Sequence, residues 1–525
     1  MNSGESSATA IRVSGTVREK AATPRNPQAS PVHAVVVALD SGVRSGAIAL
    51  LCAVMNDDST SRIVGELRQW VLAAPAGVQL PSTRALVTQY GASPVTVQKA
   101  LQRLRAEGLV ESRPGVGTFV RTIRTARAPE LGWQTAALGS PRTSAALLPG
   151  PLREAPVDAQ ALHAGYPSPD LLPERLVRTA LVRAARGAAA TARPPAAGLP
   201  DLRVWFAAEL AESTRGDLTA VGAHDVVIAP GSQSALASIF RALVPLDQPL
   251  LIESPTYWGA IHAAHQAGVR LVPVATDRGG PDPAELDRLL AQTGARAFYA
   301  QPNYANPTGA QWSPERALEV LEVVRSHGAF LIDDDWAHDF GIDTASRPVA
   351  GLDDNGHVVY LRSLTKSMSP TIRVAAVIAR GPARDRILAD RAAESMYVSA
   401  LLQQAALEVV ADPGWRTHLR RLRQQLRLRR DALVDGLRAE APGIVLDSVP
   451  AGGLHLWARL PEGTDVARLV DDAARRGVWV SAGTEWFPAE AAAPYLRMTF
   501  TGSDPAGFRD AARILAASLS EAGAV

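Results

Sequence analysis

The stretch Val358–Ala375 reads VVYLRSLTKSMSPTIRVA, an apolar strand that runs directly into a polar loop. Ser363 and Thr365 precede Lys366 by three residues and by one, and Arg373 follows it by seven. A lysine amine can condense with the aldehyde of pyridoxal 5′-phosphate (PLP), while hydroxyls and a guanidinium hold its phosphate. The stretch therefore predicts a PLP site at the end of a buried strand.

The sequence around this stretch predicts an α/β domain. From about residue 157, short β-branched runs alternate with helical stretches rich in Ala, Leu and Arg. Such a rhythm indicates a mixed, mostly parallel sheet with helices on both faces. The expected strands are DVVIAP (225–230), PLLIES (249–254), RLVPV (270–274), RAFYAQP (296–302), AFLIDDD (329–335), VVYLRS (358–363) and VAAVIA (374–379).

A second element for binding phosphate is predicted in APGSQSAL, where a strand ends at Gly231 and a helix begins with Ser232 and Gln233. Free backbone N–H groups and the helix dipole at such a start attract an anion. The tripeptide alone is weak support, because ordinary strand-to-helix turns look similar.

Three carboxylates, Asp333, Asp334 and Asp335, end the strand AFLIDDD. A buried carboxylate beside the pyridine nitrogen of PLP keeps that nitrogen protonated, so that the ring accepts electrons. Because side chains alternate along a strand, only one or two of the three can face the ring.

Three further side chains are candidates for this site. NYANPTG presents Asn306 on a turn, where its amide could bind the ring hydroxyl or simply stabilise an Asn-Pro turn. ESPTYWG puts Tyr257 after a strand end, where its ring could stack on the cofactor or pack in the core. Arg497 in YLRMTF could clamp a substrate or effector carboxylate, or form a surface ion pair.

A basic module precedes this domain. Residues 61–121 contain eight Lys/Arg against three Glu, a net charge of +5, whereas the whole chain carries +2. The charge fits nucleic-acid binding, although taken alone it fits a solvated basic face equally well.

The module is expected to begin with two helices. In PSTRALVTQYG, Ser82 can cap the second helix and Gly91 permits the left-handed turn that ends it, with Leu86 and Tyr90 pointing inward. Helical spacing predicts that the first helix buries one face through Ile63, Leu67, Trp70 and Val71.

The next helix, in ASPVTVQKALQRLRAEG, should start with Ser93 as its N-cap and Pro94 at its first position. A helix that follows a tight Gly turn in this way enters the major groove with its N-terminus first. The expected buried stripe is Val97, Leu101 and Leu104. The residues expected toward solvent or a DNA groove are Thr96, Lys99 and Arg103.

LVESRPGVGTFVR then reads as two short strands around a turn, which predicts a hairpin wing. Gly115 and Gly117 would let the backbone approach DNA closely. The module is thus predicted to be a winged helix-turn-helix.

This module resembles the winged helix of GntR-type transcription regulators over its whole length, through LPSTR, SPVTVQKAL, LRAEGLV and SRPGVGTFV. The resemblance implies binding to double-stranded promoter DNA, with phosphate contacts setting affinity and base contacts setting sequence choice. Thr96 and Lys99 could still be plain solvent-facing residues. The DNA-binding candidates are Arg84, Ser93, Thr96, Lys99, Arg113, Gly115 and Gly117.

The following domain resembles fold-type I aminotransferases in the order and spacing of its motifs. The chain from about residue 59 to 520 resembles the MocR subfamily of GntR regulators, which implies PLP as cofactor and a head-to-tail homodimer. Further matching segments are GYPSPDLLP (165–173), AGLPDLRVWFAAEL (197–210) and AGGLHLWARLP (451–461).

Mapped onto this sequence, the resemblance makes Lys366 the Schiff-base lysine and Asp334 the partner of the ring nitrogen. Asn306 would bind the ring hydroxyl, Tyr257 would stack on the ring, and Arg497 would hold an effector carboxylate. The phosphate would be held by Ser232, Gln233, Ser363 and Arg373.

One position departs from the family pattern, because Trp336 follows the acidic triplet where a tyrosine is usual. The tyrosine hydroxyl that would help Asn306 hold the ring hydroxyl is absent, and an indole N–H could partly replace it. This departure weakens the expectation of efficient transamination more than that of cofactor binding.

At 525 residues the chain should split into domains. The single cysteine, Cys52, excludes an internal disulfide framework, and the early apolar stretch 46–55 is shorter than the roughly 20 residues that span a bilayer. We therefore expect a cytoplasmic, nucleoid-associated protein without a metal site. The expected divisions are 1–58, disordered or an over-extended reading frame with Met55 as the natural start; 59–121, winged helix-turn-helix; 122–156, linker; and 157–525, aminotransferase-like effector and dimerisation domain.

The leading hypothesis is a PLP-dependent transcription regulator. Its aminotransferase-like domain would sense PLP, or an imine of PLP with an amine or amino acid, and so control promoter binding. One alternative is a working aminotransferase that carries a DNA-binding head. Another is a repressor whose second domain only dimerises and holds no cofactor.

Overall fold

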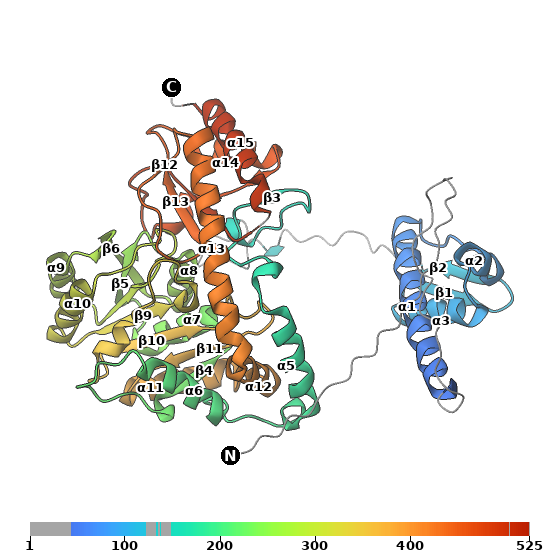
Figure 1. Cartoon of the computed structure of the whole chain (residues 1–525), viewed down its shortest axis with the longest axis horizontal. Coiled ribbons are helices and arrows are strands. Elements are labelled where there is room, and N and C mark those ends of the chain that lie inside the picture. Colours follow the sequence, from blue (N-terminus) through green and yellow to red (C-terminus); the bar gives the residue numbers. More distant parts are fainter. Residues whose placement is uncertain (1–43, 122–132, 135–136, 138–148, 503, 524–525) are drawn as a thin grey trace, which may run out of the picture. The chain divides into compact units, whose positions relative to one another are not determined.

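The chain divides into two compact units, Met1–Ala137 and Leu138–Val525 (Figure 1). The division falls inside the predicted linker, 122–156. Of that linker, residues 149–156 are described as part of the second unit. The computed structural model describes residues 44–121, 133–134, 137, 149–502 and 504–523.

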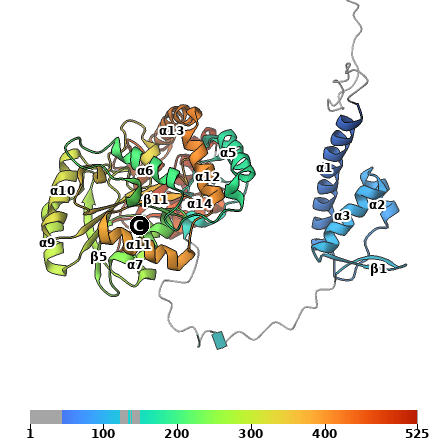
Figure 2. The same ribbon diagram turned by 90° about the horizontal axis from the view of Figure 1, so that it is seen from below.

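The first unit is a winged helix-turn-helix, as predicted, with α2 and α3 beside α1 (Figure 2). α1 begins at Arg44, so residues 44–58, which we expected to lack a fold, form the first half of this helix. Residues 1–43 lie outside the described residues. The elements are α1 (Arg44–Ala73), α2 (Thr83–Tyr90), α3 (Pro94–Ala106) and the antiparallel strands β1 (Val110–Arg113) and β2 (Gly117–Val120).

The predicted helix caps in this unit are confirmed. The Ser82 hydroxyl accepts the Ala85 N–H at 3.2 Å, and Gly91 has a φ of 58°. Ser93 accepts the Thr96 N–H at 3.1 Å, and Pro94 is the first residue of α3. These caps fix the turn that presents α3.

Two burial predictions in this unit were wrong. Trp70 is 40% exposed, because it lies at the edge of the buried face of α1, about 60° from Leu67 and about 100° from Val71. Thr96 is only 4% exposed, since it is one helical turn from the fully buried Ala100. Leu101, expected in the buried stripe, is partly buried and packs against the cluster that contains Val97 and Leu104.

The second unit is built on an eight-stranded mixed sheet of order β4-β11-β10-β9-β8-β5-β6-β7. β6, β5, β8, β9 and β10 run parallel, whereas β11 is antiparallel to both of its neighbours. Every predicted strand is present. The strands are β4 (Val226–Ala229), β5 (Pro249–Ser254), β6 (Arg270–Asp277), β7 (Gly280–Pro281), β8 (Ala297–Ala300), β9 (Phe330–Asp335), β10 (Val358–Ser363) and β11 (Ala375–Ile378).

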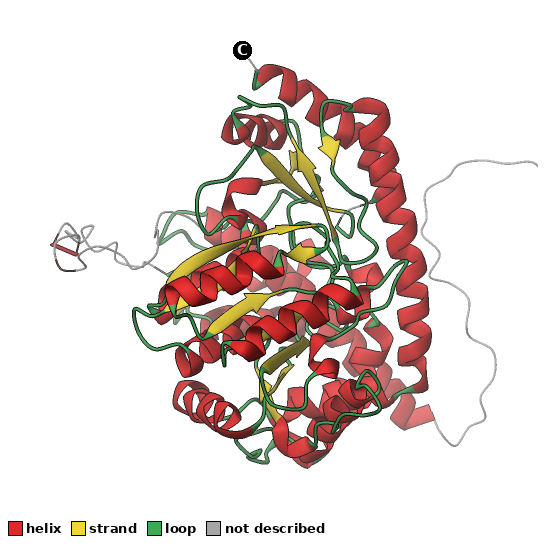
Figure 3. Ribbon diagram, turned by 90° about the vertical axis from the view of Figure 1, so that its left-hand side faces the viewer, coloured by secondary structure: helices red, strands yellow, loops and turns green. Residues whose placement is uncertain are grey.

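Helices cover both faces of this sheet, because alternate residues of its strands are apolar on both sides (Figure 3). Leu331 packs in one buried cluster and Ile332 in the other. One face is covered by α7 (Ser232–Leu243), α8 (Trp258–Ala267) and α11 (Gly381–Ser395). The other is covered by α5 (Glu174–Arg186), α6 (Pro200–Ala211), α9 (Pro283–Thr293), α10 (Pro314–Ser326) and α12 (Ala400–Ala411).

A smaller sheet and its helices form a second layer, which α13 (Pro413–Glu440) joins to the large sheet (Figure 1). The sheet order is β12-β13-β16-β15. β14 (Val478–Trp479) pairs with β3 (Gln160–Ala161), which ties the start of the unit to its end. The remaining elements are β12 (Val445–Leu446), β13 (His455–Arg459), α14 (Val466–Arg475), β15 (Ser481–Ala482), β16 (Tyr495–Thr499) and α15 (Phe508–Glu521).

The unit also contains short 3-10 helices, among them η1 (Gly150–Leu152) and η7 (Gly483–Trp486), which contact each other. Within the described part of the chain, no helix combines the length and the apolarity that crossing a membrane requires.

Candidate cofactor site

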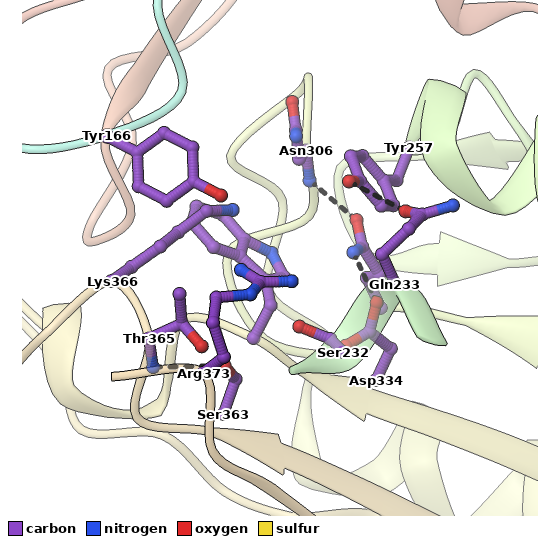
Figure 4. Close-up of a pocket in the computed structure, with 12 residues that line it drawn as sticks. Tyr166, Ser232, Gln233, Tyr257, Asn306, Asp334, Ser363, Thr365, Lys366 and Arg373 are labelled. Atoms are coloured by element: carbon purple, nitrogen blue, oxygen red, sulfur yellow. Dashed lines mark hydrogen bonds between the residues drawn. The ribbon is translucent and has the colours of Figure 1, made fainter. Parts of the chain in front are cut away.

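A pocket lies where the carboxyl ends of the parallel strands meet, the usual ligand position in such sheets (Figure 4). It has about 460 Å³ of empty space, part of which is open to solvent. Every residue predicted to bind PLP lines it. The lining residues are Tyr166, Ser232, Gln233, Tyr257, Gln301, Asn306, Asp334, Trp336, Ser363, Thr365, Lys366 and Arg373.

Lys366 extends from the loop after β10 into a cage of aromatic rings. Its Nζ lies 4.2 Å from the ring centroid of Trp336, 5.9 Å from that of Tyr257 and 6.0 Å from that of Tyr166. Burial lowers the pKa of Lys366 to about 8, although Asp334 opposes this shift. A neutral amine is therefore accessible near physiological pH, as a nucleophile requires.

Asp334 is the carboxylate of the triplet that faces the pocket. Its Oδ2 accepts hydrogen bonds from the Tyr299 hydroxyl at 2.7 Å and from Gln301 Nε2 at 2.9 Å, while its buried Oδ1 has no partner. Burial raises the pKa of Asp334 to about 6. A pyridinium N–H would satisfy Oδ1 and favour the ionised carboxylate.

The other two aspartates point away from the pocket, as strand alternation requires. Asp333 accepts the N–H of Val349 at 2.8 Å, and burial raises its pKa well above the usual value. Burial acts in the same direction on Asp335, but the charge and hydrogen bond of His338 lower its pKa overall. These two carboxylates hold neighbouring segments in place.

The phosphate-binding elements converge at the N-terminus of α7. Gly231 has a φ of 89°, and a Cβ on it would lie 2.6 Å from Arg373 Nη2, so the guanidinium rests against this turn. Ser232 begins the helix, whose first-turn N–H groups have no intrahelical partners. The Ser363 hydroxyl, at the end of β10, accepts the Thr365 N–H at 3.2 Å. This set suits a phosphate dianion.

The side chain of Gln233 is directed at Tyr257 rather than at the phosphate region. Its Oε1 accepts the Tyr257 hydroxyl at 3.0 Å, and its Nε2 donates to the Gly259 carbonyl at 2.7 Å. Gln233 therefore offers an anion its backbone N–H, and its side chain orients Tyr257 at the wall of the pocket.

Asn306 is fixed from two sides. Its N–H donates to Gln301 Oε1 at 2.9 Å, and its Oδ1 accepts the indole N–H of Trp486 at 3.2 Å. This leaves the Asn306 amide N–H₂ for a ring hydroxyl. The indole N–H of Trp336 is buried without a partner, so it can supply the donor that the sequence pattern lacks.

Arg497 does not line the pocket directly, and it is fully buried rather than in a surface ion pair. Its Nη2 donates to the His163 carbonyl at 2.5 Å, and Nη1 lies 3.0 Å from Nε2 of His455. Burial lowers the pKa of His455 well below its usual value, so the ring accepts as a neutral imidazole. The Nε of Arg497 has no partner.

These residues fit PLP. Three buried polar atoms of the lining lack partners, namely Asp334 Oδ1, Trp336 Nε1 and Thr365 Oγ1. Buried polar groups without partners destabilise a fold, and a bound polar ligand relieves that cost. The donors and acceptors match the ring nitrogen, the ring hydroxyl and the phosphate of the cofactor.

The sequence reasoning missed Tyr166 and Gln301 in the lining, and Trp486 behind it, whereas Thr365, expected with Ser363 and Arg373 to suit a phosphate, does line the pocket. Gln301 lies near the end of a predicted strand, so its position gave a usable signal. Tyr166 and Trp486 are far along the chain from the other site residues, and no local pattern marks them.

The residues predicted to contact DNA lie on the first unit. Arg84, Ser93 and Lys99 are exposed. Thr96 is buried with its hydroxyl 2.8 Å from that of Ser93, so its prediction as a groove-facing residue was wrong. Gln98, exposed beside Lys99 on α3, was not predicted.

The wing of this unit is compact. Gly115 and Gly117 have φ values of 74° and 146°. Arg113 forms an ion pair with Glu111 at 2.7 Å, and its guanidinium lies 4.6 Å from the ring centroid of Phe119.

Similar proteins include two regulators and an aminotransferase. The chain is 28% identical to Probable rhizopine catabolism regulatory protein MocR of Rhizobium meliloti, over 85% of this chain and 90% of that protein. It is 28% identical to the uncharacterized HTH-type transcriptional regulator YisV of Bacillus subtilis, over 78% and 84%. It is 27% identical to the 2-aminoadipate transaminase of Thermus thermophilus, over 68% and 88%.

A solved structure has the fold of the second unit. The alpha-aminoadipate aminotransferase LysN of Thermus thermophilus, in complex with N-(5′-phosphopyridoxyl)-L-leucine, matches with a TM-score of 0.65 and 25% identity. The match covers 70% of this chain and 93% of that one. Residues 59–120 match the family of bacterial regulatory proteins named gntR, and residues 166–515 match that of aminotransferase class I and II. The chain therefore belongs to the aminotransferase class I and II family and carries a gntR-family module at its N-terminal side.

Proposed function

We propose that this protein is a transcription regulator whose binding to promoter DNA responds to PLP, or to PLP joined to an amino compound, at Lys366. The observation that carries the proposal is the union, in one chain, of an exposed helix-turn-helix and a pocket whose buried polar atoms match PLP. The names of the related regulators YisV and MocR support it. Binding to DNA would locate the protein in the cytoplasm, at the nucleoid.

The DNA contact in this proposal is made by α3 and the wing. The candidates, Thr96 now excluded, are Arg84, Ser93, Lys99, Arg113, Gly115 and Gly117. Ser93 and Lys99 are exposed near the N-terminus of α3, the end that enters the major groove in such modules. A head-to-tail homodimer would present two such modules, and linking two weak contacts raises the effective affinity.

In the pocket, the Lys366 amine would supply the nucleophile, and Asp334 would hold a proton on the ring nitrogen. Asn306 and Trp336 would donate to the ring hydroxyl, and Arg373 and Ser232 would bind the phosphate. When bound, PLP supplies an aldehyde that links amines covalently and a ring that accepts electrons. An amine or amino acid in the cell is therefore a second effector candidate, with Arg497 as the cation for its carboxylate.

A catalytically active aminotransferase with a DNA-binding head is the second candidate. It is favoured by the complete set of Lys366, Asp334 and Asn306 and by the similarity to a 2-aminoadipate transaminase. Trp336 argues against efficient turnover, because an indole N–H cannot accept a proton or a hydrogen bond as a phenol oxygen can.

The test is the visible absorption spectrum of the full chain titrated with PLP, beside Lys366→Ala. The proposal expects a band that appears only with the lysine, shifts when one amino compound is added and gives no steady turnover. Sustained conversion of an amino donor and a keto acid would favour the enzyme. A protein that acquires no such band would contradict the PLP site itself.

A further inference from the structure

The first described residues of the second unit are anchored on η7. The Gly150 N–H contacts both carboxylate oxygens of Glu485, at 3.0 and 3.2 Å. A Cβ on Gly150 would lie 3.1 Å from Glu485 Oε1, so a glycine lets the carboxylate approach this closely. Pro151 beside it is buried. The Glu485 side chain thus binds the end of the segment that leads from the DNA-binding module.

The same short helix forms part of the support of the pocket. Trp486, adjacent to Glu485, donates its indole N–H to Asn306, and the Arg497 guanidinium carbon lies 4.6 Å from its ring centroid. A Cβ on Gly483, the first residue of η7, would lie 2.5 Å from the Cβ of Tyr495 on β16. η7 is therefore packed tightly against the strand that carries Arg497. We expect a displacement of Arg497 to be transmitted through η7 to Glu485.

A second set of contacts connects Arg497 with residues 150–153. Arg497 donates to the carbonyl of His163, and Nε2 of His163 lies 2.8 Å from the carbonyl oxygen of Arg153, to which it donates. The Arg153 guanidinium carbon lies 5.3 Å from the ring centroid of Trp479. Residues 150–153 therefore contact both Glu485, whose neighbour Trp486 packs on Arg497, and His163, whose carbonyl accepts a hydrogen bond from Arg497.

Arg497 is a buried cation with capacity for an anion. Its Nε has no hydrogen-bond partner, and the guanidinium otherwise contacts the carbonyls of His163 and Ala164, a neutral imidazole and the ring of Trp486. Burial lowers the pKa of Arg497 to about 9, and the negative charge of Glu485 opposes that shift. The Glu485 carboxylate thus interacts electrostatically with Arg497 and accepts a hydrogen bond from the Gly150 N–H.

We propose that residues 150–153 form a latch that a ligand carboxylate at Arg497 releases by displacing Glu485 from the Gly150 N–H. A ligand carboxylate at Arg497 would repel the carboxylate of Glu485, which accepts from a single backbone N–H that water can satisfy instead. A ligand shifts such an equilibrium only by its difference in affinity for the closed and released states. The latch rests on the proposed function, since it needs a PLP-bound amino compound in the pocket.

The latch is tested by hydrogen exchange of residues 149–153 in the full chain, measured by mass spectrometry. Pro149 and Pro151 have no N–H, so this peptide reports the amides of Gly150, Leu152 and Arg153. The probes are PLP and N-(5′-phosphopyridoxyl)-L-leucine, which adds a carboxylate. With the second probe we expect exchange to accelerate by about 5- to 150-fold, the usual range of coupling between sites, and with PLP alone we expect little change.

Variants separate the latch from a general loosening. Glu485→Gln keeps the acceptor without the charge, so its exchange should stay slow with both probes. Gly150→Ala crowds the Glu485 carboxylate, which must shift by a few tenths of an ångström, so its peptide should exchange faster than that of the wild type without any probe. Gly216→Ala, where a Cβ meets nothing within 4 Å, should behave as the wild type.

Two results would overturn the proposal in different ways. If both probes bind, as followed by absorbance and competition, but the wild-type peptide exchanges at an unchanged rate, the latch alone is wrong. If neither probe binds, the PLP-dependent function fails and the latch fails with it.

Discussion

The DNA-binding module and the pocket use polar side chains in opposite ways. On the module, Arg84 and Lys99 are exposed and already solvated, so each adds a small, salt-dependent increment to DNA affinity. In the pocket, Asp334, Trp336 and Thr365 keep buried polar atoms without partners, which destabilises the empty protein. Changes in the pocket should therefore have large effects, and changes on the module small ones.

The largest effect should be on the pH dependence of stability. Asp334 has a pKa of about 6 in the folded chain against 3.8 for an ordinary aspartate, so the folded chain binds the proton more tightly. Stability then falls as pH rises from about 4 to 6, by about 3 kcal/mol from this residue. Asp334→Asn without ligand should lack that fall in urea unfolding, and parallel pH curves for the two proteins would refute the buried carboxylate.

Affinity for PLP should depend on the same side chain. Asp334→Asn replaces a charge-assisted bond to the ring nitrogen, worth about 1.5–3 kcal/mol, so PLP should bind about 10- to 150-fold more weakly. Equilibrium titration of the absorbance measures this. The exposed Asp435→Asn serves as the control and should bind normally; equal affinities for both variants would contradict the assignment.

A substitution at Gly117 in the wing should have an effect of intermediate size on local stability. Gly117→Ala forces a φ of 146° on alanine and sets its Cβ 2.4 Å from Gln79 Nε2, which donates to the Val116 carbonyl at 2.9 Å. We expect local destabilisation of about 1–3 kcal/mol, seen as faster hydrogen exchange of residues 110–120. Gly115→Ala, with open space around its Cβ, should exchange more slowly than Gly117→Ala. The reverse order would show that crowding at Gly117 is unimportant.

The smallest effect should come from α3. If Lys99 contacts a phosphate, Lys99→Met should weaken DNA binding about fivefold at 0.15 M salt and reduce the salt slope by about one. Thr96→Val should leave both nearly unchanged, since Thr96 is buried. Fluorescence anisotropy with a duplex selected from a random pool measures both. A larger loss for Thr96→Val than for Lys99→Met would contradict the orientation of α3.

The sequence predicted the strands and most of the pocket because the relevant signals are local. Apolar β-branched runs mark the parallel strands, and Lys366, Asp334 and Ser232 all lie at or just after strand ends, which a parallel sheet brings together. The helix caps of the first unit were predictable for the same reason, since Ser82 and Ser93 act within their own turn.

What the sequence did not reveal depends on contacts between distant segments. Trp486 supports Asn306 from 180 residues away, and Glu485 holds Gly150 from 335.

Two errors in the first unit have a local cause instead. Thr96 looked exposed because its hydroxyl is polar, but helix periodicity places it on the same buried face as Ala100. Trp70 shows the converse, because an indole at the edge of the buried face stays 40% exposed.

The most direct test of PLP control is reciprocal binding of the full chain, measured as DNA affinity with and without PLP and as PLP affinity with and without DNA. Linkage requires both affinities to change by the same factor, and we expect about 5- to 150-fold in the wild type and none in Lys366→Ala. A wild-type factor of one, with PLP bound at Lys366, would contradict control of DNA binding by the cofactor.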